Sequence, residues 1–169
     1  RENSVVTAGG CMTSIELGIV EILRSGVYNY IDRERPGITP EEVQVVQRQA
    51  FTADYFITGT NAITEKGELF NIDGNGNRVA AISYGPKEVI VIAGSNKIVR
   101  DAEEARKRVK EISAPANAMR LDCNTPCTID GICRNCASEK RVCCTEVLTG
   151  YQRIKNRIKV IIVDGDFGF

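Results

Sequence analysis

The stretch that decides the fold is residues 5–20, VVTAGGCMTSIELGIV. A β-branched run stops at Gly9-Gly10, and an amphipathic pattern begins a few residues later. Thr13 is followed three residues later by Glu16, a capping-box pattern that predicts a helix starting directly after the glycines. A strand that turns through glycines into a helix is common in α/β folds, so the stretch predicts that class.

The same turn suggests a binding site. Glycines let a ligand approach the backbone, and the N–H groups at the start of a helix favour phosphate or carboxylate. The alternative is a tight turn that holds no ligand, since such turns are common in this class of fold. Cys11 has two corresponding interpretations, a thiol made reactive by the helix start or a small packing residue. The pattern leaves both questions open.

Strands and helices alternate along the rest of the chain. We expect a hairpin that turns at Lys66-Gly67, and residues 79–85 fit either a short helix or a strand. The alternation predicts an open, mostly parallel sheet with helices on both faces, within a single α/β domain over residues 1–169. The expected strands are 4–8, 27–31, 53–59, 88–94, 141–149 and 157–164, the last two paired with each other, and the expected helices are 13–25, 38–51 and 101–112.

Composition narrows the function classes. The chain has 169 residues, of which 43% are hydrophobic, and 22 basic residues balance 22 acidic ones, so bulk charge indicates neither a nucleic-acid nor a membrane partner. No apolar run or leader predicts membrane insertion or secretion, and we expect a cytoplasmic protein. Because a strand begins almost at once, we expect an amino-terminal segment of the fold to lie upstream. The absence of histidine excludes Ser-His-Asp and Cys-His catalysis and histidine metal sites.

A dense polar segment, GTNAITEKGELFNIDGNGNR at residues 59–78, lies between two expected core strands. Loops at strand ends commonly carry sites. Glu65 and Asp73 are its candidate catalytic carboxylates, for proton transfer or nucleophilic attack. The planar guanidinium of Arg78 is suited to bind an anion through two hydrogen bonds, and the asparagines of the segment could add amide donors. The alternative is a hairpin and a glycine-rich turn whose polar side chains satisfy their own backbone.

Six of the seven cysteines fall between residues 123 and 144, spaced C-x3-C-x5-C-x2-C-x6-C-C. We expect a cysteine-rich loop over residues 114–144. In a chain without a secretory leader, this density favours a thiolate metal site over structural disulfides. Four thiolates suit zinc or an iron–sulfur cluster, which the spacing does not separate. The alternative is free cysteines, or pairs that oxidise on handling. The predicted metal ligands are Cys123, Cys127, Cys133, Cys136 and Cys143, and Cys144 is an extra thiol.

Three blocks together resemble the lactate-utilization (LUD) domain family over nearly the whole chain. They are GGCMTSIELG (9–18), DYFITGTNAITEKGELFNIDGNGNRVAAISYGPKEVIVIAGSNKIVRDAEEA (54–105) and PANAMRLDCNTPCTIDGICRNCASEKRVC (115–143). The family tends to have serine where this chain has Cys11, and it has a longer amino-terminal helical segment. The resemblance implies a fold similar to the NagB/RpiA/CoA-transferase type, with a ligand cleft at the strand ends.

The resemblance also implies a function. Relatives are linked to oxidation of lactate to pyruvate, sometimes beside iron–sulfur subunits, so we expect an enzyme or enzyme subunit of small-carboxylate metabolism. Its ligand would be a carboxylate, a phosphate or an acyl-CoA group. The alternative is an iron–sulfur or zinc protein with a redox or ligand-sensing role and no turnover. An iron–sulfur redox partner and a homodimer are further expectations. The implied ligand-binding residues are Gly9, Gly10, Cys11, Met12, Thr13, Gly59, Thr60, Asn61, Asn71, Gly74, Gly76, Asn77 and Arg78.

Overall fold

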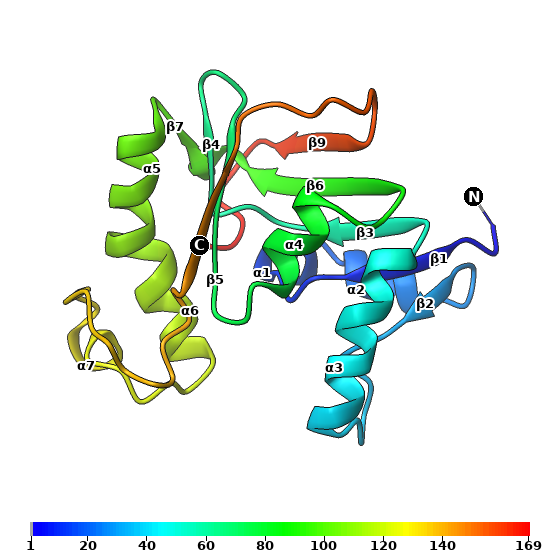
Figure 1. Ribbon diagram of the computed structural model, residues 1–169, viewed down its shortest axis with the longest axis horizontal. Helices are drawn as coiled ribbons and strands as arrows, with labels where there is room; N and C mark the ends of the chain where they lie inside the picture. The colour runs from blue at the N-terminus through cyan, green and yellow to red at the C-terminus, as the bar shows by residue number, and fades with distance from the viewer. Residues whose placement is uncertain (1) are drawn as a thin grey trace. The chain divides into compact units, whose positions relative to one another are not determined.

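A computed structural model describes residues 2–169 (Figure 1). The described chain divides into two compact units, each assembled from separate segments. The first unit comprises residues up to Gly59, Ala80–Asn96 and Gln152–Gly168, and the second comprises Thr60–Val79, Lys97–Tyr151 and Phe169. The number of domains stays a prediction. Among the described residues, no helix is both long and apolar enough to cross a membrane.

The first unit contains a five-stranded sheet in the order β2-β1-β3-β6-β9 (Figure 1), and every neighbouring pair is parallel. This confirms the predicted open, mostly parallel α/β sheet. Val89 and Val91 of β6 are fully buried, as expected of a strand inside a parallel sheet. The strands are β1 (Val5–Ala8), β2 (Asn29–Ile31), β3 (Tyr55–Thr58), β6 (Glu88–Gly94) and β9 (Ile158–Val163).

Two short helices replace the single helix expected over residues 13–25. They are α1 (Met12–Glu16) and α2 (Ile19–Arg24), and Gly18 between them has φ +69°, a left-handed conformation that breaks the helix. The predicted capping box at Thr13 is wrong. Cys11 is the N-cap of α1 and makes no side-chain capping bond, while the Thr13 hydroxyl donates to the carbonyl of Phe167 at 3.0 Å.

The helix expected at 38–51 is confirmed as α3 (Pro40–Gln49), followed by the 3-10 turn η1 (Ala50–Thr52). Thr39 and Glu42 form a complete capping box, in which the Thr39 hydroxyl accepts from the Glu42 amide and the Glu42 carboxylate accepts from the Thr39 amide. Pro40 suits the first turn because its missing N–H has no intrahelical partner there. Local sequence alone is therefore sufficient to start this helix.

The second unit contains a four-stranded sheet in the order β7-β4-β5-β8. The expected hairpin is confirmed by the antiparallel pair β4 and β5. The predicted pairing of 141–149 with 157–164 is wrong, because β8 pairs antiparallel with β5 and β9 pairs parallel with β6. Their partners are distant in sequence, and each strand belongs to a different unit. The strands are β4 (Ala62–Thr64), β5 (Leu69–Asp73), β7 (Ile98–Val99) and β8 (Thr145–Thr149).

The helix expected at 101–112 continues to residue 120. Asp101 caps its start by accepting from the amides of Glu103 and Glu104 at 3.0 Å each. The cysteine-rich loop expected at 114–144 is therefore wrong in its first part, which is helical, because the apolar inner face of this helix continues through Ala114 and Ala118. The elements are α5 (Ala102–Arg108), the π-helical segment η3 (Val109–Ser113), α6 (Ala114–Arg120) and α7 (Cys127–Asp130).

Each unit has its own apolar core. In the second unit, Phe70 of β5 is fully buried and packs with small and β-branched side chains from the helix and from β7. The core residues of the first unit are Val6, Ala8 and Leu23, with Ile19, Tyr28, Tyr30, Tyr55 and Ile57 packed against them. Those of the second unit are Ala62, Phe70, Val99, Ala105, Val109 and Ala114, with Ile72 and Cys143 packed against them.

Residues 79–85, left open by the sequence, begin in a helix, α4 (Asn77–Ser83). In the first unit, the carboxyl end of this helix is capped by Arg157, which is only 5% exposed. The guanidinium donates to the carbonyls of Ala81 at 3.0 Å, Ile82 at 2.7 Å and Pro86 at 3.2 Å. The last carbonyls of a helix lack intrahelical partners, and this single side chain satisfies two of them and the carbonyl of Pro86 beyond the helix.

Tyr30 packs against the core of the first unit, and its ionisation at alkaline pH provides a test of that packing. Burial raises the pKa of its phenol to about 12, and the negative charges of Asp32 and Glu34 add to this shift. The pKa in the unfolded chain is about 10, so Tyr30 contributes stability that is complete below pH 10 and is lost as pH rises toward 12. An absorbance titration should show one phenol ionising near pH 12. Tyr30→Phe should remove it, and an unchanged titration would contradict the assignment.

Candidate functional site

The glycine turn after β1 is packed by its own neighbours in the first unit. The Gly9 amide donates to the Ile57 carbonyl at 2.9 Å, which ties the end of β1 to β3. A Cβ on Gly59 would overlap the sulfur of Cys11, and one on Gly10 would lie 3.1 Å from the Arg33 guanidinium. Cys11 thus contacts Gly59 closely, which favours the packing interpretation of this thiol. Anion binding at the turn stays a prediction.

The segment after β9 lies against α1 and the carboxyl end of β6 in the first unit. The Thr13 hydroxyl donates to the Phe167 carbonyl, and the Gly168 amide donates to the Glu16 carboxylate at 2.6 Å. A Cβ on Gly94 would lie 2.7 Å from both the Gly165 carbonyl and the Phe167 amide. Open α/β sheets commonly bind ligands at this edge. Here the chain itself occupies part of the edge, a contact that the sequence did not predict.

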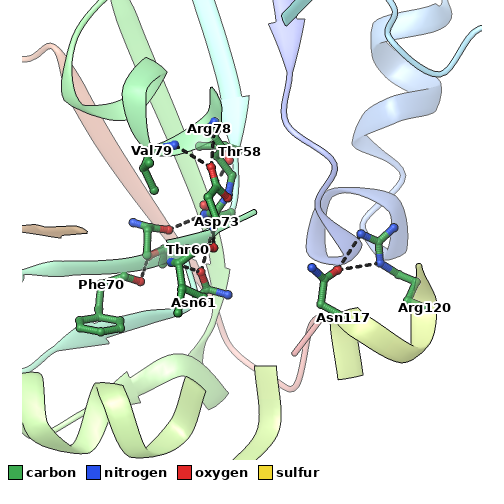
Figure 2. A network of polar contacts seen from close by, with 12 residues as sticks. Thr58, Thr60, Asn61, Phe70, Asp73, Arg78, Val79, Asn117 and Arg120 are labelled. Atoms are coloured by element: carbon green, nitrogen blue, oxygen red, sulfur yellow. Dashed lines mark hydrogen bonds and ion pairs between the residues drawn. The ribbon is translucent and has the colours of Figure 1, made fainter. Parts of the chain in front are cut away.

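A polar network in the second unit centres on the Arg78 guanidinium (Figure 2). Its Nε donates to Asp73 Oδ1 at 3.0 Å, and its Nη1 donates to Asn71 Oδ1. Its Nη2 donates to Asn61 Oδ1 at 2.9 Å and to the Ile72 carbonyl at 2.8 Å. The sequence predicted that this fork would hold an external anion. The structure brings it together with three other predicted site residues, whose side chains it binds.

Asp73 joins this network to the start of α4. Its Oδ2 accepts from the amides of Arg78 at 2.9 Å and Val79 at 3.0 Å, while its Oδ1 accepts from the Arg78 side chain. The ion pair is partly buried, with side-chain exposures of 14% for Arg78 and 12% for Asp73. Both carboxylate oxygens of Asp73 are therefore engaged within the protein. This geometry fits a positioning role.

Asn61 and Asn71 present their amide oxygens to the same guanidinium. Asn61 Oδ1 also accepts from the Ile72 amide at 3.0 Å, which fixes this side chain against β5. Asn71, in the middle of β5, is only 1% exposed, and its Nδ2 is buried without a hydrogen-bond partner. An unsatisfied buried donor is unusual and costs about 1–3 kcal/mol. Asn71 is therefore a member of the network whose side-chain donor has no partner among the described residues.

Other predicted residues of the segment lie apart or have backbone roles. Glu65 is exposed at the closed end of the hairpin, whereas Asp73 lies at the opposite end of β5. The length of β5 therefore separates the two candidate catalytic carboxylates. Thr60 donates within the hairpin, to the carbonyls of Ala62 and Phe70. The glycine-rich turn contains Gly74 and Gly76, of which only Gly76 has a positive φ, +76°, and Asn77 begins α4.

Two buried cations in the second unit were not predicted from the sequence. Arg108 donates through Nη1 to the Asn61 carbonyl and to the Ser113 hydroxyl, each at 2.8 Å, and burial lowers the pKa of its guanidinium. Lys97 is only 3% exposed. Charged side chains are normally exposed, so their residue type predicts that Arg108 and Lys97 lie at the surface. The helical spacing of Arg108 from Ala105 and Val109 was a usable signal, since both of those side chains are buried.

The cysteine-rich region contains a small cavity of about 20 Å³ within the second unit. Four of the five predicted metal ligands line it, and Cys123 does not. Among residues 2–169, no three cysteine, aspartate or glutamate side chains are arranged so that they could hold a metal ion. The lining residues are Ala114, Ala118, Thr125, Cys127, Cys133, Arg134, Cys136, Arg141, Val142 and Cys143.

Arg141 organises the backbone around this cavity. Its Nη1 donates to the Cys136 carbonyl at 2.6 Å, and its Nη2 donates to the Cys143 carbonyl at 2.7 Å. Hydrogen bonds from Ser138 lower the pKa of the Cys136 thiol. The pKa of Cys123, outside the cavity, is raised by burial and by the negative charge of Asp122. The thiols of this region therefore have different environments, although their spacing made them look alike.

The family comparison covers both units. The family model described as the LUD domain matches residues 1–163. The chain belongs to the LUD domain family. No curated protein matches this LUD domain.

Two solved structures are similar to this LUD domain. A DUF162 family protein from Deinococcus radiodurans is 15% identical with a TM-score of 0.39, and the match covers 96% of this chain and 88% of that one. The structure of eIF2B beta from Chaetomium thermophilum is 14% identical with a TM-score of 0.39, and the match covers 62% of this chain and 40% of that one. Sequence identities and TM-scores as low as these support no conclusion about function.

The predicted site residues of this LUD domain fall into two groups. Gly9 to Thr13 and Gly59 lie in the first unit, and those from Thr60 to Arg78 lie in the second. Within the second unit, Asn61, Asn71, Asp73 and Arg78 form one network. That both groups line a single cleft stays a prediction.

Proposed function

We propose that this LUD domain acts in the metabolism of a small carboxylate such as lactate or pyruvate, and that it binds the carboxylate beside Asn71. Family membership supports the metabolic class. The observation that carries the binding site is the Asn71 Nδ2 group, which is buried and has no hydrogen-bond partner. A carboxylate oxygen is an acceptor that would satisfy this donor.

The neighbours of Asn71 orient its amide for this role. Because the Arg78 guanidinium donates to Asn71 Oδ1, the Nδ2 group points away from that guanidinium. Asp73 holds Arg78 through Nε, which fixes the guanidinium in turn. Arg78 and Asp73 are therefore positioning residues in this proposal, and the amide of Asn71 makes the direct contact.

Charge near the site suits an anion. Arg78 and Asp73 neutralise each other, while Arg108 adds a second guanidinium whose hydrogen bond goes to the Asn61 carbonyl. Asn61 therefore lies between two cationic side chains, because its Oδ1 accepts from Arg78. A partly buried positive charge interacts with a carboxylate more strongly than an exposed one does. Glu65, exposed at the far end of the hairpin, is left out of the proposed site.

Titration calorimetry of the full chain with lactate and with pyruvate tests the proposal. We expect at least one of them to bind, and Asn71→Ala to weaken that binding by roughly tenfold or more, because one hydrogen bond to a charged group is lost. Asn75→Ala is the matched control, since Asn75 is exposed on the adjacent turn. Circular dichroism should verify that both variants are folded.

Two results would contradict this assignment. The first is the absence of binding heat with both acids. The second is an Asn71→Ala variant that is folded and binds as tightly as the unmodified chain. A loss of binding in Asn75→Ala equal to that in Asn71→Ala would also count against a specific contact at Asn71.

A further inference from the structure

The turn between β5 and α4 contains Asn75-Gly76, the one Asn-Gly pair in the sequence. We propose that Asn75 is a site of spontaneous covalent modification, at which its side chain closes onto the Gly76 backbone, loses ammonia and opens to aspartate or isoaspartate. The direct contact to the proposed carboxylate ligand is made by Asn71, so this modification does not depend on carboxylate binding.

Both residues of this pair are accessible in the folded chain. The Asn75 side chain is exposed, and among residues 2–169 neither its amide group nor the Gly76 N–H takes part in a hydrogen bond. Gly76 has φ +76°, and of the described atoms an added Cβ would meet only the Thr145 hydroxyl, at 3.6 Å. Glycine also reaches backbone conformations that are closed to other residues. The attacking nitrogen is therefore neither shielded nor held in place.

The reaction needs water and no other reagent. The Gly76 nitrogen attacks Asn75 Cγ, so a C–N bond forms and the bond from Cγ to Nδ2 breaks. The proton of the Gly76 amide leaves with Nδ2 as ammonia, and the product is a cyclic imide. Water then opens the ring at either of its carbonyl carbons. One opening gives aspartate, and the other gives isoaspartate, in which the main chain runs through the former side chain.

Three Asp-Gly pairs could form the same ring, but the fold protects each of them. The N–H groups of Gly131 and Gly165 donate to other groups of the protein, each at 3.0 Å. In the third pair, both carboxylate oxygens of Asp73 accept hydrogen bonds. Selectivity for Asn75 therefore comes from the folded structure as well as from the residue type. The three pairs are Asp73-Gly74, Asp130-Gly131 and Asp164-Gly165.

Isoaspartate at position 75 affects the polar network, because it adds a carbon atom to the main chain between Asp73 and Arg78. Across this turn, Asp73 Oδ2 accepts from the amides of Arg78 at 2.9 Å and Val79 at 3.0 Å. A longer connection shifts both amides relative to the carboxylate and weakens these contacts. Aspartate keeps the original chain length, and its negative charge lies near the start of a helix, where such a charge is favourable. The two products should therefore differ in stability.

Peptide mapping by mass spectrometry tests the assignment, after the full chain is incubated under native conditions at mildly alkaline pH. We expect Asn75 to convert roughly tenfold faster than Asn77 or more, because Asn75 precedes a glycine, whereas the amide after Asn77 is held by Asp73. Asn75→Gln is the matched control and should leave this peptide unconverted, since glutamine would have to close a larger ring. Equal rates at Asn75 and Asn77, or no conversion at Asn75 while other asparagines convert, would overturn the proposal.

Urea unfolding tests the effect on the network. Chain aged until it is rich in isoaspartate should unfold at a lower urea concentration than fresh chain, whereas Asn75→Asp, and Asn75→Gln aged in parallel, should keep the fresh midpoint. An isoaspartyl methyltransferase, which methylates isoaspartate and not aspartate, measures the isoaspartate fraction. An unchanged midpoint in isoaspartate-rich chain, or an equal fall in aged Asn75→Gln, would overturn this effect. These measurements contain no carboxylate ligand, so they are independent of the calorimetry.

Discussion

Replacing Arg157 by methionine is expected to lower the free energy of unfolding by about 3–5 kcal/mol, since several buried acceptors lose their donors at once. The guanidinium satisfies the carbonyls of Ala81, Ile82 and Pro86, and the side chain lies in a buried position. Methionine fills much of the volume but donates no hydrogen bond. Urea unfolding followed by circular dichroism measures the loss.

Arg153→Met is the control for this variant. Arg153 is exposed a few residues earlier in the same segment, and its replacement should leave the urea midpoint almost unchanged. Arg157→Lys adds a finer comparison, because a lysine keeps the charge but lacks the planar fork that reaches three carbonyls. An Arg157→Met variant as stable as the Arg153→Met variant would contradict the capping role.

Replacing Arg78 by methionine is expected to cost about 3 kcal/mol of stability, because it leaves the partly buried Asp73 carboxylate without its partner. The amide oxygens of Asn61 and Asn71 lose a donor at the same time. Equilibrium unfolding in urea measures this loss as well.

Arg35→Met is the control for the Arg78 variant. It breaks an ion pair with Glu42 in which both side chains are well exposed, so unfolding should change little. Similar midpoints for Arg78→Met and Arg35→Met would show that the network contributes no more than an exposed pair, and would remove the reason for assigning Arg78 a positioning role.

Much of the fold follows from local patterns in the sequence. Apolar runs predicted β1, β3 and β6, and the Thr39 capping box predicted the start of α3. The predictions were wrong where backbone conformation or contacts between distant segments override the periodic pattern of apolar residues. Gly18 divides a continuous apolar face into two helices through its left-handed backbone. The partners of β8 and β9 are set by contacts distant in sequence, which a hairpin rule applied to neighbouring strands cannot predict.

The candidate sites were predictable to different degrees. The members of the Asn61–Arg78 network are close in sequence, so a dense polar segment was enough to find them. Their roles were not predictable, because the Arg78 fork is engaged by the protein and the length of β5 separates Glu65 from Asp73. Cysteine spacing found the thiol-rich region, whereas only the cavity separates Cys123 from the other metal ligands predicted from the sequence. Arg108 was overlooked because charged side chains are normally expected at the surface.

The interleaving of the two units has a consequence during synthesis. Strand β6 ends at Gly94, yet its neighbour β9 begins at Ile158, after most of the second unit has been translated. At about 5–20 residues per second, a ribosome needs roughly 3 to 13 seconds to cover this interval. During that time the nascent chain carries an apolar strand with one unpaired edge, the kind of surface that chaperones bind and that promotes aggregation. Translation speed between these two strands is therefore expected to influence the yield of folded protein.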